Sequence, residues 1–260
     1  MVQLPTKKPN KNMLFNNKFY SNGNIVININ AYNFGGLLKM GDLIAVLNIL
    51  EHIRIVNNNQ NIKFYIPDTT LQKREYVKTF KQFVSKHSDY ISDKVGNYDF
   101  DVNNIEIWGF GKVNGHTIKI NKNLPELKKK ICIFPLIDAE YNYERNWTNK
   151  LLQKIIDGFA DEKYNGYEKI ICIKNELDKS INVFDFIISN DFETNLNYLL
   201  ECEYFVGGDT GTSHFVGALN NNKQKLTFYY NNGNHGSWES NFTTPFYSNK
   251  PNVKMEYYNK

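Results

Sequence analysis

The feature that most constrains this chain is a regular alternation between short β-branched apolar runs and longer segments of helical periodicity. An apolar run at residues 25–29 is followed from Asp42 by apolar residues spaced three and four apart, and then by a second run at 62–66. This order predicts a unit of a parallel sheet, because parallel strands need a long crossover connection. The pattern further indicates a helix at 71–90 and weaker strands at 105–108 and 117–120.

The same alternation returns in the second half of the chain. Residues 131–134 form a continuous apolar run, which is typical of a strand with both faces covered. The pattern then predicts helices at 148–159, at 193–202 and after Gly211, strands at 169–173, 204–206 and 226–230, and a less regular segment at 183–188. We therefore expect an α/β protein with two doubly wound domains, which a length of 260 residues can accommodate.

A lysine-rich stretch at 121–130 separates the two halves and is interpreted as a linker, with the lysines at 128–130 in solvent. The expected organisation is an irregular N-terminal arm at 1–23, an N-terminal domain at 24–128, and a C-terminal domain at 129–260 that ends in a polar tail.

Composition narrows the functional classes. The formal net charge of +4 suits an anionic ligand but is well short of the basic stripe of a dedicated DNA-binding protein. The three cysteines share no metal-binding spacing, which favours a reducing compartment without disulfides. We expect a cytoplasmic protein with at most peripheral membrane contact, because neither a signal peptide nor a membrane-spanning stretch is visible.

Several common catalytic signatures are absent from the sequence. The chain has no GxxxxGK[ST] phosphate loop, no GxGxxG after its first strand, no GxSxG elbow and no HExxH. No aspartate cluster suggests a dedicated divalent metal site. We therefore expect neither a metal nor a cofactor.

The segment with the clearest chemistry is the turn at 208–214, where an apolar strand runs directly into a helix. Such a junction points backbone N–H groups and the positive end of a helix dipole out of the sheet edge, which favours a phosphate. The residues that could contribute are Gly208, Asp209, Thr210, Gly211, Thr212, Ser213 and His214. Ordinary helix capping by Asp209 or Thr210 is the alternative, but it does not explain His214.

The turn resembles the C-terminal signature of the heptosyltransferase-like family 9 glycosyltransferases, in which a small residue is followed by D-[ST]-G-x-x-H. Asp209, Thr210, Gly211 and His214 match it. Gly41-Asp42 resembles the family's N-terminal G-D loop, and the Arg145-x-Trp147 sequence resembles its Lys/Arg-x-Trp. The resemblance implies the GT-B architecture, with two Rossmann-like domains facing a central cleft. The N-terminal domain is abbreviated here.

This resemblance also implies roles for the matched residues. Asp42 would be the catalytic base, while Gly41, Arg145 and the turn would bind the donor. Helix capping is the alternative role for Asp42, and a surface position is the alternative for Arg145. Glu176 follows a predicted strand and is a candidate for the donor's ribose, because acids at such sheet edges bind ribose hydroxyls; a solvated loop charge is the other interpretation.

Together these features predict a metal-independent, inverting glycosyltransferase. It would move a heptose or hexose from a nucleoside-diphosphate sugar to a glycan or lipid-linked sugar acceptor, with no obligatory nucleic acid. The alternatives are a phage-type DNA-base glucosyltransferase, a nucleotide-sugar epimerase, or a nucleotide-sugar-binding protein without turnover. A DNA enzyme would show salt-sensitive DNA affinity, and donor hydrolysis would separate an enzyme from a binding protein.

Overall fold

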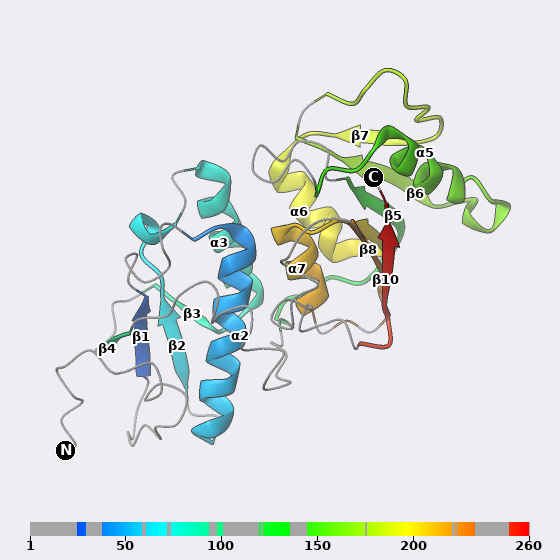
Figure 1. Ribbon diagram of the computed structural model, residues 1–260. Helices are drawn as coiled ribbons and strands as arrows, with labels where there is room; N and C mark the ends of the chain where they lie inside the picture. The colour runs from blue at the N-terminus through cyan, green and yellow to red at the C-terminus, as the bar shows by residue number, and fades with distance from the viewer. Residues whose placement is uncertain are drawn as a thin grey trace, which may run out of the picture. The chain divides into compact units, whose positions relative to one another are not determined.

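The structure, a computed structural model shown in Figure 1, falls into two compact units along the chain. The residues it describes are 25–29, 38–58, 61–71, 74–93, 98–100, 120, 122–135, 145–174, 176–219, 221, 223–231 and 250–259.

Unit 1 contains β1 (Ile25–Ile29), α2 (Met40–Val56), β2 (Ile62–Tyr65), η2 (Asp68–Thr70), α3 (Glu75–His87), β3 (Ile91–Ser92) and β4 (Tyr98–Phe100). Unit 2 contains β5 (Lys128–Phe134), α5 (Asn149–Gly158), η4 (Glu162–Tyr164), β6 (Glu168–Cys172), β7 (Ile187–Ser189), α6 (Phe192–Glu201), β8 (Cys202–Gly207), α7 (Gly211–Ala218), β9 (Lys225–Asn231) and β10 (Val253–Tyr258).

The sheet of unit 1 is parallel, with the strand order β3-β2-β1-β4. Ile27 of β1 is paired with Phe64 on one side and with Tyr98 on the other. The apolar face of α2 predicted from its periodicity is buried and packs toward β2 and α3. The chain runs from β1 to β2 and β3 on one side, and β4, which follows β3, lies on the other side of β1, so the carboxyl end of β1 is a topological switch point.

The sheet of unit 2 is also parallel and has the order β10-β9-β8-β5-β6-β7. Numbered from β5, this is the 3-2-1-4-5-6 order of dinucleotide-binding Rossmann folds. The strand order reverses between β5 and β8, where Ile133 pairs with Val206 and Phe134 with Gly207. Ligands of open α/β sheets bind outside the carboxyl ends of the strands at such a point.

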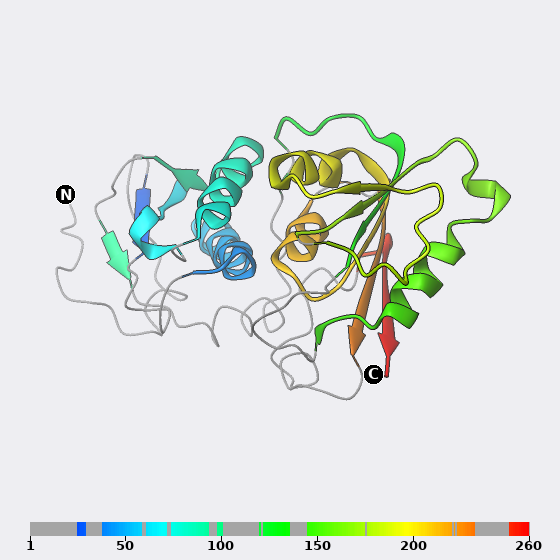
Figure 2. The ribbon, with the colours of Figure 1, turned by 90° about the horizontal axis from the view of Figure 1, so that it is seen from above.

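Helices cover both faces of this second sheet, as Figure 2 shows for α5 (green) and for α6 and α7 (yellow and orange). Successive side chains of β5 alternate accordingly. Ile133 joins a buried cluster with Trp147 and the apolar side of α5, whereas the Cys132 thiol donates to the carbonyl of Tyr198 in α6 at 3.8 Å. The three cysteines are buried and free.

The predicted alternation of strands and helices is confirmed in both units, but two predictions are wrong. The lysines at 128–130 are not a linker, because they begin β5. Lys128 and Lys129 are exposed to solvent as predicted, whereas Lys130 lies 3.0 Å from Glu201 and 3.3 Å from Glu168. Ion pairing to α6 and β6 lets Lys130 lie within the strand.

The polar tail is the second error, because residues 253–258 form β10 and pair in parallel with β9. Polar residues are tolerated there because β10 is an edge strand. The predicted arm at 1–23 and the strand at 105–108 lie outside the described residues, as does 117–119; Ile120 forms an isolated parallel bridge with Leu219. Within the described segments, no helix is long and apolar enough to cross a membrane.

Candidate functional site

The turn predicted from sequence lies where the topology of unit 2 places a ligand. It connects the carboxyl end of β8, at Gly207, to the first residue of α7, Gly211. Since β8 neighbours β5 at the strand-order reversal, the amino end of α7 opens at the switch point of the sheet. The first N–H groups of such a helix have no acceptor within the helix and favour an anion.

Asp209 in this turn holds two basic side chains. Its Oδ2 lies 2.8 Å from Nη1 of Arg145, and its Oδ1 lies 3.3 Å from Nε2 of His214. The side chains of Asp209 and His214 are only 6% and 4% exposed, whereas that of Arg145 is 30% exposed. The carboxylate therefore orients two cationic or donor groups, one of which reaches the surface.

Thr210 caps α7. Its Oγ1 accepts from the backbone N–H of Ser213 at 3.2 Å, and its carbonyl accepts the first helical bond, from His214, at 3.0 Å. The same Oγ1 lies 2.7 Å from Oγ1 of Thr212 and 3.1 Å from Oγ of Ser213. Of the two candidate caps, Thr210 is the one observed, so the carboxylate of Asp209 is available to contact Arg145 and His214.

Gly207 keeps the turn close to the sheet. A Cβ at this position would lie 2.5 Å from Oγ of Ser213 and 2.6 Å from the ring of Phe205. Any side chain would thus displace the hydroxyl group or the strand. Sequence reasoning singled out the next glycine and missed this one, although two adjacent glycines at a strand end were the available signal.

Tyr258, at the end of β10, is a second residue that the sequence did not reveal. Its hydroxyl donates to the carbonyl oxygens of Arg145 at 3.1 Å and Asn146 at 3.4 Å. Burial and the charge of Asp209 raise the pKa of this phenol to about 12. It was missed because its strand was interpreted as a polar tail.

Glu176 is the predicted ribose ligand of unit 2. It is exposed on the connection between β6 and β7. Among the described contacts, none joins it to Arg145, Asp209 or His214. The structure therefore brings together Arg145 and the turn, and does not bring Glu176 to them; its role toward a ribose stays a prediction.

In unit 1, Gly41 and Asp42 lie in the first turn of α2, which follows the switch-point strand β1. Asp42 is buried, and its Oδ2 accepts from the backbone N–H of Lys39 at 3.1 Å. The capping role considered for Asp42 is thus observed. This hydrogen bond holds the carboxylate of Asp42 at the amino end of α2.

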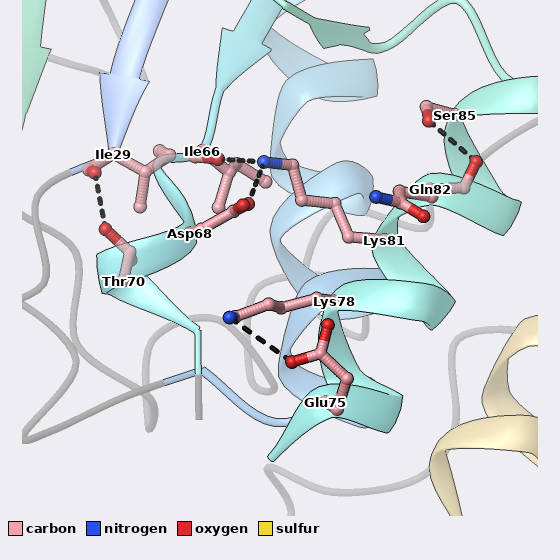
Figure 3. A network of polar contacts seen from close by, with 9 residues as sticks. All are labelled: Ile29, Ile66, Asp68, Thr70, Glu75, Lys78, Lys81, Gln82 and Ser85. Atoms are coloured by element: carbon pink, nitrogen blue, oxygen red, sulfur yellow. Dashed lines mark hydrogen bonds and ion pairs between the residues drawn. The ribbon is translucent and has the colours of Figure 1, made fainter. Parts of the chain in front are cut away.

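The segment after β2, residues 66–70, makes hydrogen bonds to β1, to α3 and to the residue that precedes Lys39, as Figure 3 shows in part. Thr70 donates its hydroxyl to the carbonyl of Ile29 at 3.3 Å, and its own carbonyl accepts from the N–H of Leu38 at 2.8 Å. From α3, Lys81 donates to the carbonyl of Ile66 at 2.5 Å and to Asp68 at 2.8 Å. These contacts fix the chain on either side of the residues that lead into Asp42.

The chemistry available in unit 2 is that of an anion site. A guanidinium, an imidazole, the hydroxyls of Thr210 and Thr212 and a helix N-terminus gather around one turn, and such groups donate to phosphate oxygens. Ser213 is fully buried and its hydroxyl lies against Thr210. Among the described residues, no group of three or more His, Cys, Asp or Glu is arranged to hold a metal ion.

Comparisons with known proteins bear on the fold. No protein-family model matches the chain, and no curated protein matches it in sequence. Among solved structures, E. coli heptosyltransferase WaaC with ADP is similar at a TM-score of 0.50 and 11% identity, over 89% of this chain and 92% of that chain.

Two further structures resemble the chain less. They are the same E. coli enzyme with ADP-2-deoxy-2-fluoro heptose (TM-score 0.48, 12% identity, 88% and 92% covered) and a family 9 glycosyl transferase from Veillonella parvula DSM 2008 (TM-score 0.46, 10% identity, 90% and 86% covered). The likeness to the first structure shows the fold alone: this chain has the α/β fold of that structure, with parallel sheets and helices as the sequence pattern predicted.

Proposed function

We propose that this chain is a glycosyltransferase that takes its donor sugar from a nucleoside diphosphate bound at the turn 208–214. The observation that carries the proposal is the contact of Asp209 with both Arg145 and His214 at the switch point of a Rossmann sheet. Capping alone accounts for Thr210 but gives no reason to assemble two basic groups on one buried carboxylate.

Each residue of the proposed donor site has a role in binding the diphosphate. Arg145 and His214 donate to the diphosphate, and the amino end of α7 stabilises the charge that develops as the nucleoside diphosphate leaves. Gly211 lets the backbone approach the phosphates, and the hydroxyl of Thr212 is a further donor. The buried hydroxyl of Ser213 supports the turn through Thr210, and Gly208 completes it. Asp209 orients the two basic side chains rather than contacting phosphate, because its oxygens are occupied by them.

The remaining assignments extend the proposal to the reaction. Asp42 removes the proton of the acceptor hydroxyl as its oxygen attacks C1 of the sugar, which inverts the anomeric centre. The positive groups take over the task that a metal ion performs elsewhere, so we propose a metal-independent transfer. The acceptor class is a glycan or a lipid-linked sugar.

ADP is the first nucleotide to test, because the E. coli heptosyltransferase of the same fold is described with ADP. Calorimetric titration with ADP, GDP and UDP should give saturable binding of at least one of them to the wild-type chain. Arg145→Gln should weaken that binding about tenfold or more, since a charge-assisted pair is worth about 1.5–3 kcal/mol. Exposed Arg74→Gln, in the other unit, is the matched control.

Hydrolysis of the matching nucleotide sugar without acceptor separates an enzyme from a binding protein. Slow release of the nucleoside diphosphate supports a transferase. If the wild-type chain binds none of the three nucleotides, the proposed function is wrong; if it binds one and never releases it from a sugar donor, only the catalytic part is wrong.

A further inference from the structure

Arg145 reaches the donor site from a different connection of the sheet. It carries a long, flexible side chain in the connection between β5 and α5, and it reaches Asp209 in the connection between β8 and α7. A guanidinium loses considerable rotamer freedom when it is held in one place. It binds phosphate more tightly when that freedom has been removed before the ligand arrives.

The backbone of this arginine is fixed by Tyr258. The hydroxyl of Tyr258 reaches the carbonyl oxygens of two successive residues, Arg145 at 3.1 Å and Asn146 at 3.4 Å. One hydroxyl proton shared between adjacent carbonyls restrains the orientation of the peptide unit between them. Asp209 thus holds the guanidinium of Arg145, and Tyr258 holds the backbone of the same residue.

The tyrosine is itself firmly placed. It packs against the buried cluster that contains Trp147 and Val206, and it is the last residue of β10, paired with Asn231. Because the pKa of the phenol is raised to about 12, chiefly by burial and then by Asp209, the hydroxyl stays a donor throughout the neutral range.

We propose that Tyr258 is a positioning residue, which through the backbone of Arg145 holds the guanidinium where it meets Asp209. The inference rests on the proposed function, because it assigns Tyr258 a part in nucleoside-diphosphate binding. Tyr258 does not touch the ligand in this scheme. It acts only through the arginine.

The test is a double-mutant cycle on nucleotide affinity, measured calorimetrically with whichever of ADP, GDP and UDP binds the wild-type chain most tightly. Tyr258→Phe keeps the ring and removes the hydroxyl, and it should weaken binding about three- to tenfold, where tenfold corresponds to about 1.4 kcal/mol. In an Arg145→Gln background the same change should alter the affinity less than twofold, because the side chain being positioned is gone.

Two controls separate positioning from a general structural role. Tyr257→Phe removes a hydroxyl from the adjacent residue of the same strand, whose side chain is 59% exposed, and should leave the affinity unchanged. Replacing Tyr258 by p-aminophenylalanine restores an N–H donor on the same ring, and should recover affinity to within twofold of wild type.

Two results would overturn the inference: wild-type affinity in Tyr258→Phe, or a loss that persists in full in the Arg145→Gln background. If Tyr258→Phe does not fold, the p-aminophenylalanine variant decides, since a donor-bearing ring that folds and binds poorly also contradicts the assignment. Failure of the wild-type chain to bind any nucleotide would instead reject the proposed function.

Discussion

The guanidinium of Arg145 and the carboxylate of Asp209 meet at 2.8 Å although the two residues belong to different strand–helix connections. Asp209 also faces His214, so its charge is shared by two basic groups in a largely buried place. The ion pair therefore links fold stability to the candidate site.

Asp209→Asn should lower the free energy of unfolding by about 1–3 kcal/mol, because a buried ionic hydrogen bond loses its charge while Arg145 stays partly exposed. Urea unfolding monitored by circular dichroism measures the change. Asp161→Asn is the control, because its pair with Lys163 is more than half exposed on both sides and solvent screens such a pair, so the substitution should change stability little. Equal effects of the two substitutions would show that the buried carboxylate has no special part in stability.

Asp42→Asn should reduce donor hydrolysis about 100-fold or more, the usual contribution of a general base. The nucleotide affinity should stay within about twofold, because the substitution changes no donor-site residue. The fold should persist, since an asparagine oxygen can still accept from the N–H of Lys39. Glu75→Gln replaces an exposed acid in the first turn of α3, in the same unit, and should leave hydrolysis unchanged. If Asp42→Asn keeps full activity, Asp42 is not the general base.

Gly207→Ala should destabilise unit 2 by about 1–3 kcal/mol, because the added methyl overlaps the Ser213 hydroxyl and the Phe205 ring. Nucleotide affinity should fall as well, since the turn must shift to make room. Gly158→Ala, at the end of α5, meets nothing within 4 Å and should be neutral or stabilising by up to about 1 kcal/mol. Similar unfolding midpoints for the two variants would contradict the close packing at Gly207.

His87 should make unit 1 sensitive to acid. Burial lowers the pKa of His87 below 6.5, although Nδ1 lies 3.0 Å from the carbonyl oxygen of Lys122, a contact that opposes the shift. The unfolded chain therefore binds more protons, so this contribution to stability is complete above pH 6.5 and is lost as the pH falls through the lowered pKa.

His87→Gln should flatten the decline in unfolding free energy below pH 6.5, because glutamine has no proton to take up. Urea unfolding at a series of pH values down to about pH 5 measures the slope. Identical slopes for variant and wild type would mean that His87 does not cause the acid sensitivity.

The parts of the fold that followed from sequence were those with strong periodic signals. The strand at 131–134 is continuously apolar because both faces of the sheet are covered, and α5 buries one apolar face with helical spacing. The strand positions of Lys130 and of β10 could not be predicted from the sequence. A charged residue enters a strand only when partners such as Glu201 lie opposite it, and that partnership is set by tertiary structure.

The candidate site was predictable in part for the same reason. Asp209, Thr210 and His214 are close in sequence, so their turn could be recognised locally. The contact between Tyr258 and Arg145 joins residues far apart along the chain. Such a hydrogen bond leaves no local pattern, because the register of an edge strand decides it.

The pairing of β5 with β8 has a consequence for how the protein folds. These strands are neighbours in space, yet α5, β6, β7 and α6 separate them in the chain. A contact this distant must overcome the entropy of closing a long loop, which makes such pairings slow to form. Since the turn after β8 and the segment of Arg145 meet only when these strands do, the candidate site should appear late in refolding, together with the central strand pair.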